Sequence, residues 1–205
     1  MNITPSQHDL LKELINIGVG KAAGLINQMV STHVELDLPE VRLLDSEGMA
    51  EYLGRNGTEI LSTVRLGFRG ALSGWAGLVF PKPTASWLVS QLIGQELGAA
   101  SMDLDSLRIG TIQEVGNIVL NGIMGSIVNI LGVSVDYFPP DYFETGLSGL
   151  FAAEETTTRV VMFIKARFRL EDKDVEGDIL ILFHVDTFQD MLAALDRLLL
   201  GNTPS

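Results

Sequence analysis

The sequence predicts an α+β protein of two similar halves, in which a mainly antiparallel β-sheet packs against helices. Three observations predict this class. One short pattern of Glu, Asn and Pro occurs twice, 101 residues apart. Each copy begins on a long stretch with helical apolar spacing, and two strand-like segments in hairpin order follow it. We therefore expect residues 1–205 to form a single domain built of two repeats, about 1–95 and 103–201, related by a pseudo-two-fold axis.

The first half is predicted to open with a long helix. Thr4-Pro5-Ser6-Gln7 is typical of a helix start with a capping box, and the helix should run to about Ser31. Its apolar positions have helical spacing: Leu11, Leu14, Ile15, Ala22, Leu25, Ile26 and Met29. The later elements are expected as a strand at 34–38 that Pro39 stops or edges, an extension at 41–44, a short helix at 46–53, a hairpin of 60–68 with 72–80, and a helix at 83–93.

The second half is predicted to repeat this order after a linker at 95–102. The elements are expected as a long helix at about 103–131, a strand at 133–138 stopped by Pro139-Pro140, a partly helical connection at 141–155, a hairpin of 157–170 with 177–185, and a closing helix at 187–200. Two such halves would pair their sheets and stack their helices.

Composition limits the classes of function. The chain is 46% hydrophobic and carries a formal net charge of −12, so it should fold around a core and should not bind nucleic acid or an anionic membrane surface. Solubility alone would explain the acidity; a sharper interpretation is that some carboxylates face a cationic group on a partner.

The absence of cysteine, the scattered histidines and the short apolar runs argue against further classes of site and of protein. The chain has no cysteine, which rules out disulfides and thiol chemistry and suits a reducing cytoplasm. Residues 1–8 lack a signal-peptide pattern, and no apolar run approaches the roughly 18 residues of a membrane span. His8, His33 and His184 are scattered without ligand spacing, so we expect no metal site in the chain itself.

The repeated pattern supplies the candidate site residues. In each copy two residues separate Glu from Asn and twenty-two separate Asn from Pro; the copies are Glu13, Asn16 and Pro39, and Glu114, Asn117 and Pro140. Asn is unfavourable within a helix, so its presence twice indicates a role. We interpret Glu and Asn as projecting towards a partner and doing chemistry there. A solvated helix face, copied by duplication, is the open alternative.

Glycines and prolines surround this pattern. Asp9 and Gly20 lie on the helical stripe of Glu13 and Asn16. Glycines in both long helices either allow close packing or, as at Gly20, leave room for a partner's backbone near Glu and Asn. The two prolines are structural in our interpretation, since they would fix how the chain turns beside each helix.

The pattern Asp/Ser-x-x-x-Glu-x-x-Asn, with Pro twenty-two residues later, resembles that of the CheC/CheX/FliY phosphatases of bacterial and archaeal chemotaxis. The flanking sequences, Glu13 to Gly20 and Glu114 to Ile118, agree with it. Two copies resemble CheC in particular. CheX carries one copy and dimerises, and FliY carries an additional flagellar switch domain for which we expect no room after 187–200.

The resemblance implies dephosphorylation of the phosphoaspartate of a CheY-type response regulator. Asn16 and Asn117 would orient the attacking water, and Glu13 and Glu114 would pair with the regulator's active-site lysine, neither acting as a general base. The Mg²⁺ would come with the phosphorylated regulator, so the chain needs no cofactor of its own. The implied protein is cytoplasmic, and its internal pseudo-dimer favours a monomer, although exposed strand edges leave pairing open.

The two copies differ at one position of the family pattern. Asp9 precedes Glu13 by four residues and could help to dock the partner, whereas Gly110 stands at the equivalent place before Glu114. The first copy is therefore the stronger candidate site. A non-catalytic module that binds a receiver domain or a CheD-like deamidase is the alternative function, and the residues do not show whether CheD binds.

Overall fold

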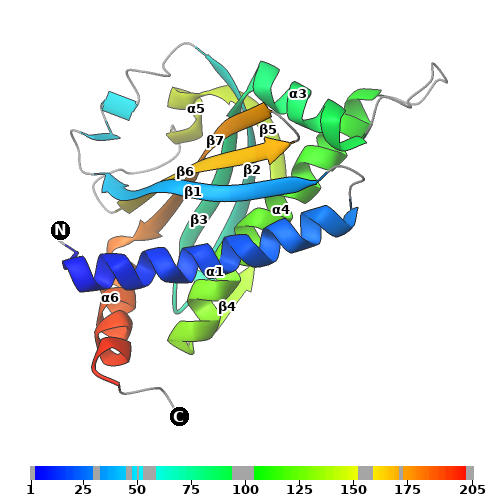
Figure 1. The fold of residues 1–205 in the computed structure, drawn as a ribbon. Helices are drawn as coiled ribbons and strands as arrows, with labels where there is room; N and C mark the ends of the chain where they lie inside the picture. Colours follow the sequence, from blue (N-terminus) through cyan, green and yellow to red (C-terminus); the bar gives the residue numbers. More distant parts are fainter. Residues whose placement is uncertain are drawn as a thin grey trace.

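A computed structural model describes residues 3–29, 33–44, 48–49, 51–52, 59–93, 104–151, 159–170 and 173–201. Five helices and seven strands are assigned there, and Figure 1 shows the sheet beside the two long helices. The helices are α1 (Pro5–Met29), α3 (Lys82–Ile93), α4 (Leu104–Leu131), α5 (Leu147–Phe151) and α6 (Val185–Leu199). The strands are β1 (Val34–Leu44), β2 (Ile60–Gly70), β3 (Gly74–Pro81), β4 (Val135–Tyr137), β5 (Asp141–Gly146), β6 (Arg159–Leu170) and β7 (Lys173–His184).

The seven strands form one antiparallel sheet, which confirms the predicted α+β class. Its order is β1-β6-β7-β3-β2-β4, with β5 also paired to β2. The central pair, β3 with β7, joins the two halves of the chain, and Gly77 lies opposite Leu180 there. The similar segments of the two hairpins are offset by 103 residues, which is also the offset between Gly77 and Leu180. These pairings are arranged symmetrically about that point, as the predicted duplication would require; the duplication itself stays a prediction.

The sheet carries a core on each face. The larger core packs α1, α3, α4 and α6 against one face, and its fully buried members include Ile15, Ile123, Phe183 and Phe188. The smaller core lies on the other face, where α5 and Tyr52 pack over Trp75, Phe163 and Leu182. Alternation along β7 explains the division, because Leu180 and Leu182 point to the smaller core whereas Ile179 and Ile181 point to the larger.

The first helix is fixed at both ends by side chains that its sequence supplies. The predicted capping box is present: Thr4 N donates to Gln7 Oε1 at 2.9 Å, and Gln7 N donates to Thr4 Oγ1 at 3.2 Å. Near the other end, the Asn27 amide bonds both backbone groups of Val34, at 2.6 and 2.8 Å. Helix α1 is thereby tied to the start of β1, which sets the direction of its exposed face.

The long helices α1 and α4 meet at glycines. A Cβ on Gly18 would lie 2.3 Å from the carbonyl oxygen of Gly122, and one on Gly122 would lie 2.7 Å from that of Gly18. At Gly116 a Cβ would lie 2.5 Å from Val64 of β2. Close packing therefore explains these three glycines. Gly20, Gly24, Gly110 and Gly125 have no atom within 4 Å of an added Cβ and need another explanation.

One strand prediction is confirmed and another is incomplete. Pro39 lies in an edge strand, one of the two predicted possibilities, and the predicted extension at 41–44 is present: β1 continues through a register shift between Asp37 and Glu40 at the edge of the described sheet. In the second half, the predicted connection at 141–155 begins with β5, which pairs with β2, followed by the short helix α5. Alternation is weak in Asp141–Gly146, so its pairing was not evident from the sequence.

The other boundaries agree with the expected elements or fall outside the described residues. The second hairpin is tighter than predicted, because β7 begins at Lys173 and not at Gly177. The linker at 95–102 lies outside the described residues, as does most of the short helix predicted at 46–53, although residues 48–49 and 51–52 are helical. Helix α4 ends at Leu131, where Gly132 adopts a φ of 66°.

Helix α4 is a core helix by its packing. Its segment Ser106–Leu131 is long and apolar enough to cross a membrane by length and composition alone, but 61% of the apolar window is buried within the protein. The burial is against α1, α3, β2 and β3, so the same hydropathy is explained by the core.

The glycine contacts predict opposite effects for one substitution at two places on α1. Gly18→Ala should destabilise the protein by about 2 kcal/mol, because the new methyl group meets the Gly122 backbone. Gly24→Ala should stabilise it by roughly 0.5–1 kcal/mol, because that position is open and Ala favours the helix. Urea unfolding of both variants would measure this. Equal effects would show that the helix crossing does not depend on Gly18.

Candidate functional site

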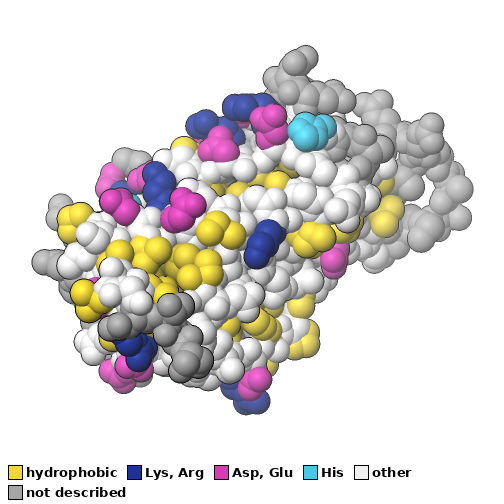
Figure 2. Space-filling view, turned by 60° about the horizontal axis from the view of Figure 1, so that its bottom comes forward, with side chains coloured by type: hydrophobic (Ala, Val, Ile, Leu, Met, Phe, Trp, Pro, Cys, Tyr) yellow, Lys and Arg dark blue, Asp and Glu magenta, His cyan; other side chains and the backbone are white. Residues whose placement is uncertain are grey.

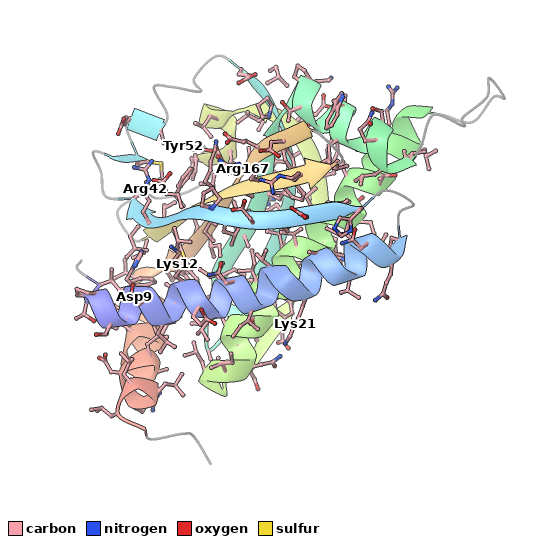
Figure 3. All side chains as sticks on the ribbon, viewed as in Figure 1. Asp9, Lys12, Lys21, Arg42, Tyr52 and Arg167 are labelled. Atoms are coloured by element: carbon pink, nitrogen blue, oxygen red, sulfur yellow. The ribbon has the colours of Figure 1, made fainter. Side chains whose placement is uncertain are left out.

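The predicted residues of the first copy lie on the exposed face of α1. Asp9, Glu13, Asn16 and Gly20 are all exposed, whereas the intervening Leu14 and Ile15 are buried in the larger core. The steps of four, three and four residues place them along one stripe of the helix. Figure 3 shows Asp9 near the start of this helix and Lys21 farther along it.

The carboxylate and amide of this copy are unengaged. Within the described part of the chain, neither Glu13 nor Asn16 has a hydrogen-bond or ion-pair partner in its side chain. Asp9 contacts neither of them; its carboxylate lies 3.7 Å from His8 Nδ1, and His8 Nε2 lies 2.9 Å from the Val41 carbonyl oxygen. Glu13 and Asn16 therefore present a free carboxylate and a free amide, one helical turn apart.

The second copy on α4 is arranged differently. Glu114 is exposed, but Asn117 is half-buried. The Asn121 amide donates to the Asn117 side-chain Oδ1 at 2.6 Å and to the Asn117 backbone oxygen at 2.9 Å. Gly110, which takes the place of Asp9, is exposed with open space around it. The amide of the second copy is therefore already bonded to a neighbour on its own helix.

The two prolines lie in or next to strands, and not on the helices that carry Glu and Asn. Pro39 is exposed at the irregularity of β1. Pro140 immediately precedes β5, and its carbonyl oxygen accepts a hydrogen bond of 2.5 Å from Gln113 Nε2 of α4. In the second half this bond ties the chain after the proline to the motif-bearing helix, which fits the structural role predicted for Pro140.

A partly apolar surface, which includes the exposed Lys21, continues from Asn16 along α1. Ile17, Leu25 and Met29 are 37%, 50% and 55% exposed, and Gly20 and Gly24 beside them are open. Leu25 and Met29 share the helical spacing of the buried apolar positions of α1 but are themselves exposed. Figure 2 shows hydrophobic side chains gathered on this side of the molecule, with charged side chains among and around them. Such a surface suits docking of another protein.

Two polar residues near the site were not singled out from the sequence. Lys21 is exposed on α1, four residues after Ile17. Asn121 is the hydrogen-bond donor to Asn117. A signal for Asn121 was available, because it stands 101 residues after Gly20 and so breaks the repeat at a position beside the amide.

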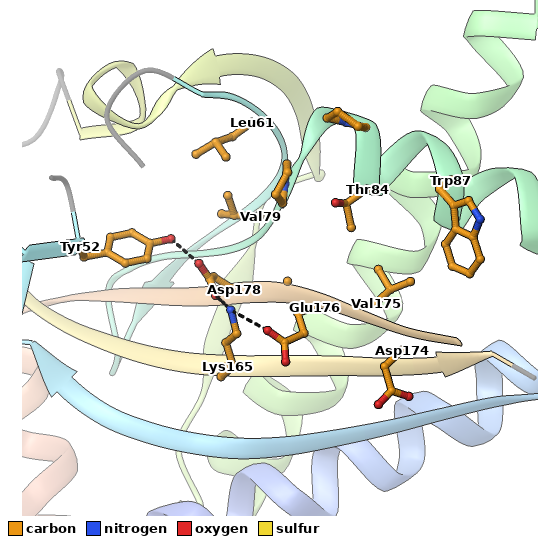
Figure 4. Close-up of a pocket in the computed structure, with 13 residues that line it drawn as sticks. Tyr52, Leu61, Val79, Thr84, Trp87, Lys165, Asp174, Val175, Glu176 and Asp178 are labelled. Carbon is orange, nitrogen blue, oxygen red and sulfur yellow. Dashed lines mark hydrogen bonds and ion pairs between the residues drawn. The ribbon is translucent and has the colours of Figure 1, made fainter. Parts of the chain in front are cut away.

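One cavity lies on the opposite face of the sheet and is a poor candidate for this chemistry. Its volume is about 800 Å³. Figure 4 shows its lining residues, which include residues of β7 and of the start of α3. Lys165 Nζ lies 3.2 Å from Asp178 and 3.4 Å from Glu176, and the Tyr52 hydroxyl donates to Asp178 at 2.9 Å. Burial lowers the pKa of Lys165, but these carboxylates outweigh it and raise the pKa overall. The charges there pair with one another.

The part of the chain that the structure describes contains no cluster of side chains suited to binding a metal ion. Within it, no three His, Asp or Glu side chains lie close enough together to hold an ion.

Comparisons with known proteins find similarity to CheC in sequence and to FliY, FliM and CheX in fold. No family model matches the sequence. The chain is 22% identical over 201 residues to the CheY-P phosphatase CheC of Bacillus subtilis, which covers 94% of this chain and 95% of CheC.

Solved structures share the fold. FliY of Thermotoga maritima matches with a TM-score of 0.72 and 16% identity, over 96% of this chain and 99% of FliY. The FliM middle domain of H. pylori matches with a TM-score of 0.68 and 10% identity, over 94% and 99%. CheX from the CheX–CheY–BeF₃–Mg²⁺ complex of Borrelia burgdorferi matches with a TM-score of 0.52 and 17% identity, over 82% of this chain and 96% of CheX. The resemblance to the CheC/CheX/FliY family predicted from the repeated pattern is thus confirmed, with similarity to CheC along nearly the whole sequence and the fold of FliY and CheX.

Proposed function

We propose that this protein dephosphorylates the phosphoaspartate of a CheY-type receiver domain in chemotaxis or related two-component signalling. The observation that carries the proposal is the exposed Glu13–Asn16 pair on α1, whose amide and carboxylate have no partner within the described chain and which is bordered by the open Gly20. The similarity to CheC supplies the substrate class, and a neighbour in fold, CheX, was solved in complex with CheY.

The reaction needs little from the chain itself. Water attacks the phosphorus, the bond between phosphorus and the aspartate oxygen breaks, and the products are inorganic phosphate and the free carboxylate. In phosphoryl transfer, catalysis is mostly positioning and electrostatic stabilisation, and the receiver domain would bring its Mg²⁺ and its lysine. Asn16 would hold the water in line, since its amide both accepts and donates a hydrogen bond.

Glu13 would set the register of docking. A carboxylate that has no cation on its own protein is available to a lysine of the partner, and complementary charge steers and orients an encounter. Asp9 lies on the same exposed stripe, two turns from Asn16, and would extend the acidic end of this surface. Gly20 would admit the partner's backbone beside Asn16.

The setting follows from the same proposal. A substrate of this class is a cytoplasmic signalling protein, so we place the chain in the cytoplasm, without nucleic-acid binding or membrane insertion. We also propose that the two halves are repeats of one ancestral unit, which would make a monomer with two related sites. CheD remains a further partner suggested only by the family resemblance.

A non-catalytic adaptor is the second candidate function, and one observation favours it. The FliM middle domain shares this fold over 94% of the chain, and FliM of H. pylori has also been solved in complex with FliG. Fold similarity therefore extends to proteins described by their assembly with others. As an adaptor, the chain would bind a receiver domain through α1 and leave the lifetime of the phosphate unchanged.

Removing the two pattern asparagines tests the phosphatase directly. Asn16→Ala with Asn117→Ala should abolish the stimulated loss of phosphate from a phosphorylated cognate regulator. Asn16→Ala alone should lower the rate by about tenfold or more, and further than Asn117→Ala, because Asn117 is half-buried and bonded to Asn121. Decay of the phosphorylated regulator would be followed with and without each variant.

Asn129→Ala is the matched control, because it removes an exposed helical asparagine outside the pattern. It should leave the decay rate unchanged. Wild-type protein that binds the phosphorylated regulator without shortening the life of its phosphate would favour the adaptor. A double variant as active as wild type would rule out both proposed sites.

Neutralising Glu13 separates docking from chemistry. Glu13→Gln should raise KM for the phosphorylated regulator by about tenfold and weaken its dependence on salt, because the ion pair with the partner's lysine is lost, while kcat changes little. Asp190→Asn on α6 removes an equal charge elsewhere and should alter neither constant. A fall in kcat at unchanged KM would instead give Glu13 a direct part in the reaction.

A further inference from the structure

The two copies of the pattern differ at the fourth residue after the asparagine. In α1 this residue is Gly20, and in α4 it is Asn121, which stands 101 residues later. On a helix, side chains four residues apart lie one above the other, so this position borders the asparagine amide in each copy. The difference therefore falls beside the group proposed to hold the water.

Asn121 uses its donor group on Asn117. Its Nδ2 lies 2.6 Å from the Asn117 Oδ1 and 2.9 Å from the Asn117 backbone oxygen, so its amide hydrogens are directed to one residue. The backbone bond fixes the Asn121 side chain over the preceding turn, and the side-chain bond then fixes the Asn117 amide. In α1 an added Cβ at Gly20 would have no atom within 4 Å, and Asn16 has no partner in the described chain.

We propose that Asn121 restrains Asn117 and so makes the second site the weaker of the two. This rests on the proposed phosphatase function. A water held in line must donate to the amide oxygen while it accepts from the amide nitrogen or another donor. Asn121 occupies a lone pair of that oxygen and opposes its rotation towards an incoming phosphate. Asn121 is thus a positioning residue, and it acts through Asn117.

The same bond could in principle prepare Asn117 for catalysis, but two features oppose this. The bond engages the Asn117 Oδ1 that the water needs. Its donor, Asn121, occupies the position that is Gly20, with no side chain, in the first copy. Asn117 is also half-buried, whereas Asn16 is exposed. The two interpretations predict opposite signs when the bond is removed.

The test isolates the second site in an Asn16→Ala background. Asn121→Leu keeps the size of the side chain and removes its donor, so it should raise kcat for the decay of the phosphorylated regulator several-fold. The limit is about tenfold, the equivalent of one hydrogen bond between neutral groups. Asn121→Gly removes the side chain as well, so it should raise kcat similarly and also lower KM.

The reciprocal exchange tests the first site in an Asn117→Ala background. Gly20→Asn should lower kcat several-fold, because the new amide can bond Asn16 as Asn121 bonds Asn117. Gly20→Leu adds similar bulk without a donor, so it should raise KM and leave kcat close to that of the background protein. A common effect of both variants on kcat would assign the change to bulk and overturn the proposal.

Failure of this inference is distinguishable from failure of the proposed function. If the wild-type protein is active but Asn121→Leu leaves kcat of the second site unchanged or lowers it, the restraint is disproved. If the wild-type protein is inactive, the proposed phosphatase function is disproved, but NMR of the side-chain amides still tests whether Asn121 is hydrogen-bonded to Asn117. Asn121→Leu should then shift and sharpen the Asn117 amide signals and leave those of Asn16 unchanged; unaltered Asn117 signals would overturn the restraint.

Discussion

The close approach of α1 and α4 is the contact on which the site depends. The helices meet at Gly18 and Gly122, where the backbone of each lies against the other without a side chain between them. Because the contact is made by backbone, the two helices can lie side by side over the sheet and bury their apolar faces together. The stripe with Glu13 and Asn16 is the face left over once that packing is satisfied.

Ties at the ends of α1 fix how that face is presented. Gln7 joins the helix start to Asp196 of α6, with 2.8 Å between Nε2 and Oδ1, and Asn27 joins the helix end to β1. These bonds restrain rotation of α1 about its axis. A helix held at its centre by glycine contact and at both ends by side chains is a rigid support for a carboxylate and an amide.

Much of the fold could be predicted from the sequence because its signals are local. The Thr4–Gln7 capping box, the glycines after the helices and the alternating hairpins each report on a few neighbouring residues. The signals failed where the outcome depends on a distant partner: β5 is a strand because β2 offers an edge. Leu25 and Met29 have core spacing on α1, yet only tertiary packing shows which turns of the helix are covered.

The candidate site was predictable in its residues but not in its asymmetry. The repeat identified Glu13, Asn16, Glu114 and Asn117, because one offset of 101 residues relates both pairs. The sequence also showed that Asp9 and Gly110 occupy equivalent positions, and in the structure the Asp9 carboxylate lies 3.7 Å from His8 Nδ1. The difference that engages the amide itself, Asn121 for Gly20, required the side-chain geometry.

This asymmetry bears on how one fold serves both enzymes and assembly proteins. The chain is similar in sequence to CheC, a CheY-P phosphatase, and in fold to FliM, which has been solved in complex with other proteins. The scaffold therefore cannot carry the difference between them. On the proposed mechanism the chain contributes chiefly one free amide, since metal, lysine and phosphate arrive with the partner. A neighbouring side chain that engages that amide would then be enough to make a catalytic surface one that only binds its partner, without altering the fold.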